Sequence, residues 1–195
     1  MNKKIGCVLM AAGNAKRFGE NKLSRTLNGV SLIDRALQCI PKEKLHKTVV
    51  VSQYDEVIEK AQSMGFDALK NEHPDFGISH TIKLGLEQTS DCDAVMFMVS
   101  DQPLLKKESV SNMIDYYQKN DDYIVGMSYD CVRGNPCIFP KCYFSELRKL
   151  REDHGGNTVI RKHEDKLKLF SATHPDELSD IDTKEDLEKL ENTEV

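Results

Sequence analysis

The sequence lacks the features that would place the chain in a membrane or direct it out of the cell. Its 195 residues contain no apolar run long enough to span a bilayer, and its mean hydropathy is -0.51. The short apolar stretch at residues 5–12 is followed by glycine and arginine, where a signal peptide would have its cleavage site. We therefore expect a cytoplasmic protein without a membrane partner.

The sequence also lacks the cysteine spacings of a metal-binding or redox protein. It has six cysteines, but they include no C-x-x-C pair, and no histidines stand at zinc-finger spacing. In a reducing compartment such cysteines stay as thiols. We expect six free and mostly buried thiols.

Charge is unevenly distributed, although the net charge is only -5. Residues 1–50 carry ten Lys and Arg against three Asp and Glu, whereas residues 171–195 carry two against nine. A nucleic-acid-binding protein would normally be basic overall. The pattern instead favours a small anionic ligand near the N terminus and no nucleic-acid partner.

Short apolar runs alternate with segments of helical periodicity through most of the chain. The runs at residues 5–10, 48–52, 94–100 and 123–129 are typical of strands buried on both faces, and residues 31–40, 54–64, 79–89 and 107–119 have helical spacing. This alternation predicts an α/β fold with a doubly wound, mostly parallel sheet. No repeat or linker interrupts it, so residues 1–195 are expected to form one domain.

The pattern is less regular after residue 129. Residues 137–139, between two prolines, predict an irregular strand or an edge insertion, and residues 143–151 predict a helix. A strand at 167–172 and a helix at 183–190 are expected to close the fold. Thr183 and Asp186 have the spacing of a capping box for that last helix.

The segment after the first predicted strand combines small residues with cations. Ala11, Ala12 and Gly13 allow backbone N–H groups to approach an anion closely, and Arg17 and Lys22 follow in the same loop. The segment has neither the Gly-Lys-Ser/Thr of a P-loop nor the G-x-G-x-x-G of a dinucleotide site. It predicts a loop that binds a triphosphate; the alternative is a strand-to-helix turn flanked by solvated cations.

A second signal follows the most apolar predicted strand. Asp101, in Asp101-Gln102-Pro103, comes at the carboxyl end of this strand, where ligands bind in open α/β sheets. A carboxylate there can hold Mg²⁺ against phosphate oxygens. The alternative is that Asp101 caps the helix that begins near Lys106.

These segments, together with others further along, occur in the order found in a known family. They are 11–13 with Arg17, Gly19 and Lys22; 77–79 and 84–86; 101–103; 134–136 with 139–140; and 180–183 with 185–187. The chain resembles the MobA-like NTP transferases from residue 9 to residue 187. Within them it is more similar to the molybdenum-cofactor cytidylyltransferases than to the guanylyltransferases.

The resemblance implies a Rossmann-like fold of the nucleotide-diphospho-sugar transferase type, with a nucleotide site and a metal. Arg17 would contact the β and γ phosphates, and Lys22 would stabilise charge on the α phosphate. Asp101 would bind Mg²⁺, with Asp182 as a second ligand or a support for the first. The base and ribose pocket would be formed by Leu9, Ala11, Ala12, Gly13, Gly77 and Ser79.

The resemblance also implies the reaction: transfer of CMP from CTP to the phosphate of a molybdopterin-type cofactor, with release of pyrophosphate. Met10-Ala11-Ala12-Gly13, where guanylyltransferases usually read Leu-Ala-Gly-Gly, favours CTP over GTP. The acceptor would be bound by Gly134, Asn135, Pro136, His154 and Gly155. Asn157 departs from cytidylyl relatives, which often have a basic residue there.

Three alternatives stay open. The first is a transferase that uses GTP, and the second is one that acts on a sugar phosphate or a polyol phosphate. The third is a protein that only binds the molybdenum cofactor and delivers it to a molybdenum hydroxylase, the partner that a transferase of this kind would also contact transiently. Arg17, Lys22 and Asp101 argue against the third, because cofactor delivery alone does not require them.

Overall fold

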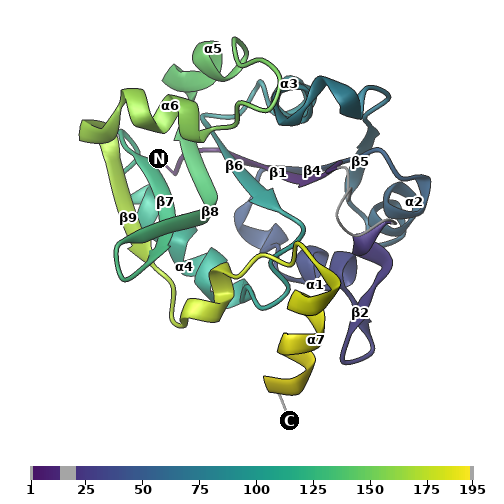
Figure 1. Ribbon diagram of the computed structural model, residues 1–195. Coiled ribbons are helices and arrows are strands. Elements are labelled where there is room, and N and C mark those ends of the chain that lie inside the picture. Colours follow the sequence, from purple (N-terminus) through teal and green to yellow (C-terminus); the bar gives the residue numbers. More distant parts are fainter. Residues whose placement is uncertain (1, 14–20, 194–195) are drawn as a thin grey trace.

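A seven-stranded sheet forms the centre of the computed structural model, which describes residues 2–13 and 21–193 (Figure 1). Its strands lie in the order β5-β4-β1-β6-β8-β7-β9, and only β8 is antiparallel to its neighbours. The strands are β1 (Ile5–Ala11), β4 (Lys47–Ser52), β5 (Asp67–Lys70), β6 (Ala94–Val99), β7 (Ile124–Tyr129), β8 (Val132–Pro140) and β9 (Leu167–Ser171). The predicted mostly parallel α/β fold is confirmed.

Helices cover both faces of the sheet (Figure 1). One face packs against α1 (Leu32–Gln38), α2 (Asp55–Ser63) and α4 (Lys107–Gln118). The other packs against α3 (Ile78–Gln88), α5 (Phe144–Leu147) and α6 (Asn157–Lys162). Alternate residues of β1 divide between the two cores, with Cys7 and Leu9 in the first and Val8 in the second.

The four strands and four helices predicted in the first two thirds of the chain are present, with ends that differ by at most two residues. Ser31 caps α1, since its Oγ accepts a hydrogen bond from the Asp34 N–H. The predicted capping box of α7 (Lys184–Thr193) is also present: Thr183 Oγ1 accepts from Asp186 N–H, and Asp186 Oδ2 accepts from Thr183 N–H.

Of the two alternatives predicted for residues 137–139, the irregular strand is present and the edge insertion is wrong. These residues belong to β8, which lies inside the sheet between β6 and β7. Pro136 is tolerated because pairing with β6 begins only at Cys137, and pairing with β7 is irregular just before it. The helix predicted at 143–151 is also shorter than expected, because it consists of a 3-10 turn followed by α5.

A short hairpin and the last helix form a small separate cluster near one end of α1 (Figure 1). Strands β2 (Thr26–Leu27) and β3 (Val30–Ser31) are joined by Asn28 and Gly29, which both have positive φ, as a type I′ turn requires. Leu27, Leu32 and Ile181 form its small core.

All six cysteines are free and four are buried, as predicted. Within residues 2–13 and 21–193, no helix is long and apolar enough to cross a membrane.

Helix α3 approaches β1 through a glycine. A Cβ added at Gly85 would lie 2.3 Å from Cγ1 of Val8. Alanine normally stabilises a helix interior by about 1 kcal/mol relative to glycine. At position 85 we expect the reverse, because the extra methyl group would push the helix off the sheet.

Gly85→Ala should therefore lower the free energy of unfolding by about 1–3 kcal/mol in urea titrations. Glu87→Ala, on the exposed side of the same helix, should change it by less than about 0.5 kcal/mol. Adding Val8→Ala to Gly85→Ala should recover part of the loss. A stabilised Gly85→Ala protein would contradict the close packing.

Candidate active site

Two adjoining cavities lie at the carboxyl ends of β1 and β6, where the strand order of the sheet reverses direction. The smaller, of about 480 Å³, is lined by Ala12, Gly13 and Lys22 among others, and the larger has a volume of about 690 Å³. Met10 and Val99, which pair across β1 and β6, line both. This is the position where open α/β sheets bind ligands.

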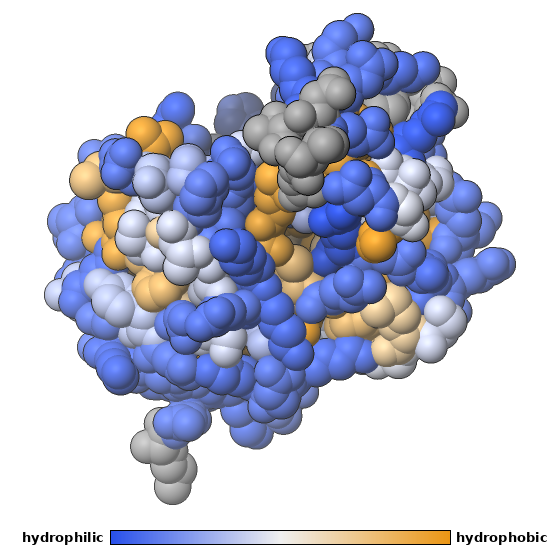
Figure 2. All heavy atoms as spheres, turned by 90° about the horizontal axis from the view of Figure 1, so that it is seen from below, coloured by the Kyte–Doolittle hydropathy of each residue, from blue (hydrophilic) through white to orange (hydrophobic). Residues whose placement is uncertain are grey.

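The larger cavity is the more apolar of the two. Ile78, Phe97, Phe139 and Ile160 contribute to its wall, and the rings of Phe97 and Phe139 meet edge to face with centroids 6.0 Å apart. The face seen in Figure 2 is hollowed near its middle, where hydrophobic side chains are framed by hydrophilic ones. Such a cavity suits an organic molecule that presents apolar surface together with some polar groups.

The backbone that leaves β1 is held in place by side chains from neighbouring strand ends. Successive carbonyl oxygens accept hydrogen bonds: Met10 O from Ser100 Oγ at 3.1 Å, Ala11 O from Ser52 Oγ at 2.8 Å, and Ala12 O from Gln53 Nε2 at 3.0 Å. The start of the predicted triphosphate loop therefore has a fixed course. These side chains were not predicted from the sequence.

Lys22 lies between two carboxylates beside the smaller cavity. Its Nζ is 2.9 Å from Asp101 Oδ2 and 3.6 Å from Asp182 Oδ1, and it donates to Ile181 O at 2.6 Å. Its side chain is only 14% exposed. Residues far apart in the sequence, each singled out in the sequence analysis, thus meet in one charged cluster.

Asp101 retains an oxygen that can bind a cation. Oδ1 is buried and has no hydrogen-bond partner in the described part of the chain, a costly arrangement for a carboxylate. Helix α4 begins at Lys107 and has no side-chain cap of its own, so Asp101 is not its cap. Asp101 and Asp182 therefore fit a divalent metal.

The charged cluster offers only a few carboxylates to a divalent metal. Among residues 2–13 and 21–193 no three His, Cys, Asp or Glu side chains converge as a preformed metal cage. Mg²⁺ usually binds through one or two carboxylates and completes its coordination with substrate phosphates and water. Asp101 and Asp182 match that requirement.

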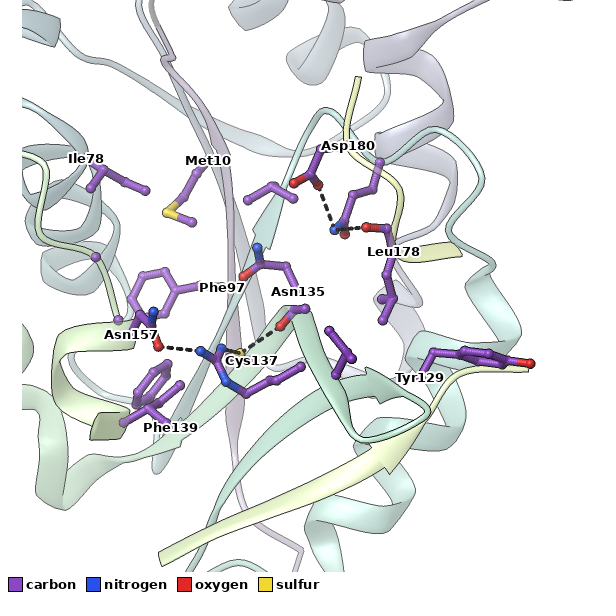
Figure 3. A pocket seen from close by; sticks show the side chains of 18 of the residues that line it. Met10, Ile78, Phe97, Tyr129, Asn135, Cys137, Phe139, Asn157, Leu178 and Asp180 are labelled. Atoms are coloured by element: carbon purple, nitrogen blue, oxygen red, sulfur yellow. Dashed lines mark hydrogen bonds between the residues drawn. The ribbon is translucent and has the colours of Figure 1, made fainter. Parts of the chain in front are cut away.

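A third carboxylate, Asp180, connects the charged cluster to the larger cavity. Its Oδ1 accepts a hydrogen bond from Gln102 Nε2 at 2.9 Å, and the same nitrogen donates to Leu178 O at 3.3 Å (Figure 3). Loss of solvent, followed by the negative charge of Asp101, raises the pKa of Asp180 above its usual value. The cluster thus carries excess negative charge, which a metal would relieve.

Buried Glu177 holds the segment that carries Asp180 and Asp182 against the rest of the fold. It is 1% exposed, and it accepts hydrogen bonds from Thr173 N–H and Oγ1, from His174 N–H and from Lys106 N–H at the start of α4. Burial alone would raise the pKa of Glu177, but these hydrogen bonds outweigh it and hold the pKa below its usual value.

The lowered pKa of Glu177 predicts a pH-dependent contribution to stability. A carboxyl group with a lowered pKa in the folded state stabilises the fold above its unfolded pKa, and this stabilisation is lost as pH falls through the folded pKa. Glu177→Gln should therefore cost about 2 kcal/mol near pH 7, and the difference from the wild type should narrow in acid. Urea titrations between pH 7 and pH 3 measure it, with exposed Glu59→Gln as control. A difference independent of pH would contradict this role.

Some of the predicted nucleotide-binding residues line the smaller cavity, and the others are buried beneath its wall. Ala12, Gly13 and Gly77 line it. The side chain of Leu9 instead packs in the core, because alternate residues of β1 face opposite sides, and Met10 lies at the cavity. The buried residues Ala11 and Ser79 support the wall: Ala11 O accepts from Ser52, and Ser79 N–H donates to Glu152 O. Arg17 lies outside the described residues.

Gly77 has a structural reason to be glycine. Its φ is +77°, and a Cβ there would lie 2.4 Å from the backbone carbon of Glu152. The close crossing brings the loop after Glu152 over the start of α3. As a result, Asp153 lines the smaller cavity and Gly155 the larger.

The predicted acceptor-binding residues lie mostly at the larger cavity. Gly134, Asn135 and Gly155 line it. Pro136 is buried within β8, and exposed His154 turns its Nδ1 to Arg151 O at 3.0 Å. Three further residues line this cavity. Gln102 and Asp180 belong to motifs named in the sequence analysis, which gave them no role, and Arg133 was overlooked.

Solved structures share this fold over nearly the whole chain. A nucleotidyl transferase from Methanothermobacter superposes with a TM-score of 0.81 at 19% identity, covering 97% of each chain. Rv0371c from Mycobacterium tuberculosis, solved with manganese, gives 0.75 at 17% identity over 98% and 99%. Molybdopterin-guanine dinucleotide biosynthesis protein A from Archaeoglobus fulgidus gives 0.69 at 17% identity over 96% and 97%.

The sequence relatives are slightly more similar, but some match over only part of their length. PucB from Bacillus subtilis, a purine catabolism protein, is 21% identical over an alignment of 201 positions, gaps included, which covers 94% of each chain. GlmU from Clostridioides difficile is 25% identical over 117 residues. That region covers 58% of this chain and 25% of GlmU, so the chain corresponds to only part of that bifunctional protein.

Fold and sequence together define a nucleotidyltransferase of the α/β class. The sequence model of the MobA-like NTP transferase domain matches residues 7–167, which is most of the chain. The chain belongs to the MobA-like NTP transferase family, whose members depend on a divalent metal.

Proposed function

We propose that this chain is a Mg²⁺-dependent cytidylyltransferase that transfers CMP from CTP to the phosphate of a molybdopterin-type cofactor. The observation that carries the proposal is the cluster of Lys22, Asp101 and Asp182 in the wall of the smaller cavity. The larger, more apolar cavity adjoins it at Met10, Ile78 and Val99, which line both. Two substrates bound in adjoining cavities would meet at this cluster.

The smaller cavity is assigned to the nucleotide. Two residues in its wall, Gly13 and Lys22, belong to the predicted triphosphate loop, and Arg17 lies between them in the sequence. Lys22 Nζ is the cation that would contact the α phosphate, and Arg17 would bind the β and γ phosphates. Ala12 and Gly77 border the space left for ribose and base.

The larger cavity is assigned to the acceptor, with Gly134, Asn135 and Gly155 in its wall. An oxygen of the acceptor phosphate attacks the α phosphorus of CTP. A new P–O bond forms there as the bond to the oxygen bridging the α and β phosphorus atoms breaks, and pyrophosphate leaves. No protein nucleophile is needed, so catalysis depends on alignment and charge neutralisation.

Asp101 and Asp182 would hold the metal in this reaction. When bound, Mg²⁺ would neutralise phosphate oxygens and orient the leaving group. Lys22 would then move from the two carboxylates toward the α phosphate, where its charge is needed. Asp180 and Gln102 would border the path from the cluster into the acceptor cavity.

The remaining assignments follow from the same proposal. One domain holds both substrates, since the two cavities share residues of β1, α3 and β6. Six free thiols suit the reducing cytoplasm. A molybdenum hydroxylase would receive the product.

GTP is kept as a second candidate, because the similar structure from A. fulgidus belongs to a protein named for molybdopterin-guanine dinucleotide biosynthesis. For this chain, the sequence Met10-Ala11-Ala12-Gly13 favours CTP. The preference for CTP over GTP therefore depends on this loop sequence alone.

The test is a nucleotide screen with product identification. Purified protein and Mg²⁺ are incubated with CTP or GTP, and with either molybdenum cofactor or a sugar phosphate as acceptor. Pyrophosphate is measured, and the product is identified by mass spectrometry. We expect pyrophosphate and a cytidylylated cofactor with CTP. Preference for GTP would contradict the nucleotide assignment, turnover only with a sugar phosphate would contradict the acceptor, and no turnover with any nucleotide would contradict the enzyme.

A further inference from the structure

Arg133 extends from β8 into the wall of the larger cavity. Its Nη2 donates to Asn157 Oδ1 on α6, and its Nη1 lies 3.5 Å from Cys137 Sγ (Figure 3). None of the ion pairs found within residues 2–13 and 21–193 includes Arg133. A guanidinium with only neutral partners thus borders an apolar cavity.

The local structure makes room for this side chain. A Cβ added at Gly126 on β7 would lie 2.8 Å from Arg133 Cδ, so the arginine stem passes directly over a glycine. The pairing between β7 and β8 also shifts in register between Gly126 and Ser128. The stem is thereby held against the sheet while Asn157 orients the head.

The cavity around Arg133 restricts the kind of molecule that it can recognise. Phe97, Phe139 and Ile78 offer apolar surface, and the polar side chains in its wall include Gln102, Tyr129, Asp130, Asn135, Asn157 and Asp180. Sugar or polyol hydroxyls would lose water wherever they lie against the apolar surface. A planar heterocycle would lie against the apolar walls, and oxygen atoms fixed in its plane could accept the paired N–H groups of a guanidinium.

We propose that Arg133, oriented by Asn157, is a specificity-determining residue that binds in-plane oxygen atoms of a planar heterocyclic acceptor. The identification of this heterocycle as the acceptor rests on the proposed function, whereas its binding to the cavity does not.

Equilibrium binding without nucleotide or metal tests the proposal separately from turnover. The probe is pterin-6-carboxylate, a fluorescent planar heterocycle that carries a carboxylate, titrated with wild-type protein and with variants. Arg133→Met should weaken binding by about tenfold or more, the effect of losing a charge-assisted pair. Arg161→Met, an exposed arginine on α6, should bind like the wild type.

Gly126→Ala provides a second variant in which Arg133 keeps its charge but its stem is displaced. It should also weaken probe binding, and thermal unfolding monitors whether both variants keep their fold. Glucose 1-phosphate should displace the probe poorly from wild-type protein.

Wild-type affinity in Arg133→Met would overturn the role of Arg133. Failure of the wild-type protein to bind the probe would overturn the ligand class. Displacement of the probe by glucose 1-phosphate at concentrations similar to that of the probe itself would also overturn it. Lack of transferase activity alone would contradict only the proposed function, because the binding assay contains no second substrate.

Discussion

Asp101→Asn should reduce nucleotidyl transfer by about 10²–10³-fold or more while the protein stays folded. The substitution keeps the shape of the side chain but removes the charge that pairs with Lys22 at 2.9 Å. It also replaces a buried oxygen that has no partner in the described part of the chain. The loss should appear as a fall in the rate of pyrophosphate release at saturating CTP.

The control for Asp101→Asn is Asp115→Asn, which breaks a surface ion pair with Lys44 at 2.6 Å. It should leave turnover unchanged, because surface pairs contribute only about 0–1 kcal/mol and this one is remote from both cavities. Thermal unfolding of both variants should stay close to the wild type. Retained activity in folded Asp101→Asn would remove Asp101 from the metal site.

Lys22→Met should change two measurements in opposite directions. Turnover should fall by about 10²–10³-fold, because the α phosphate loses its cation. Binding of Mn²⁺ without nucleotide should instead become tighter by about tenfold, because Lys22 Nζ lies between Asp101 and Asp182 and repels a second cation there. Mn²⁺ titration followed by electron paramagnetic resonance measures this affinity.

Lys44→Met is the matched control for Lys22→Met, since it removes an equal charge elsewhere on the surface. It should alter neither measurement. Unchanged or weaker Mn²⁺ binding in Lys22→Met would contradict the prediction. It would show that the metal does not bind beside the Lys22 ammonium group. The prediction thus distinguishes a lysine that only binds phosphate from one that also competes with the metal for Asp101 and Asp182.

The sequence was most informative where local and global signals agree. Buried strands such as Ile5–Ala11 are continuous apolar runs, and helices such as Lys107–Gln118 have clear periodicity, so both were predicted closely. Lys22, Asp101 and Asp182 were singled out from motifs, and the structure brings them together although the chain separates them widely.

Features that depend on tertiary packing were missed. Pro136 suggested an edge position, because the sequence does not show that the pairing of β8 with β6 stops at Cys137, one residue after the proline. Nothing in the sequence singled out Glu177 among the acidic residues near the C terminus, yet it is buried and accepts hydrogen bonds from Thr173 and from the start of α4. The short hairpin could have been predicted, since Asn28-Gly29 is typical of a type I′ turn.

Cavity walls were predicted only in part for the same reason. The sequence placed Leu9 in the nucleotide pocket, but the alternation of β1 turns it into the core and exposes Met10. Arg133 had no motif beside it, and its importance depends on Gly126 and Asn157, which reach it from β7 and α6. Only the folded chain makes that combination visible.

A crystal structure with CTP and Mn²⁺ would test the account's central claim most directly, because manganese is located by its anomalous scattering. We predict one manganese ion bound by Asp101 and Asp182, with Lys22 Nζ moved onto the α phosphate and the larger cavity left for the acceptor. Manganese away from Asp101, or nucleotide base in the larger cavity, would contradict it.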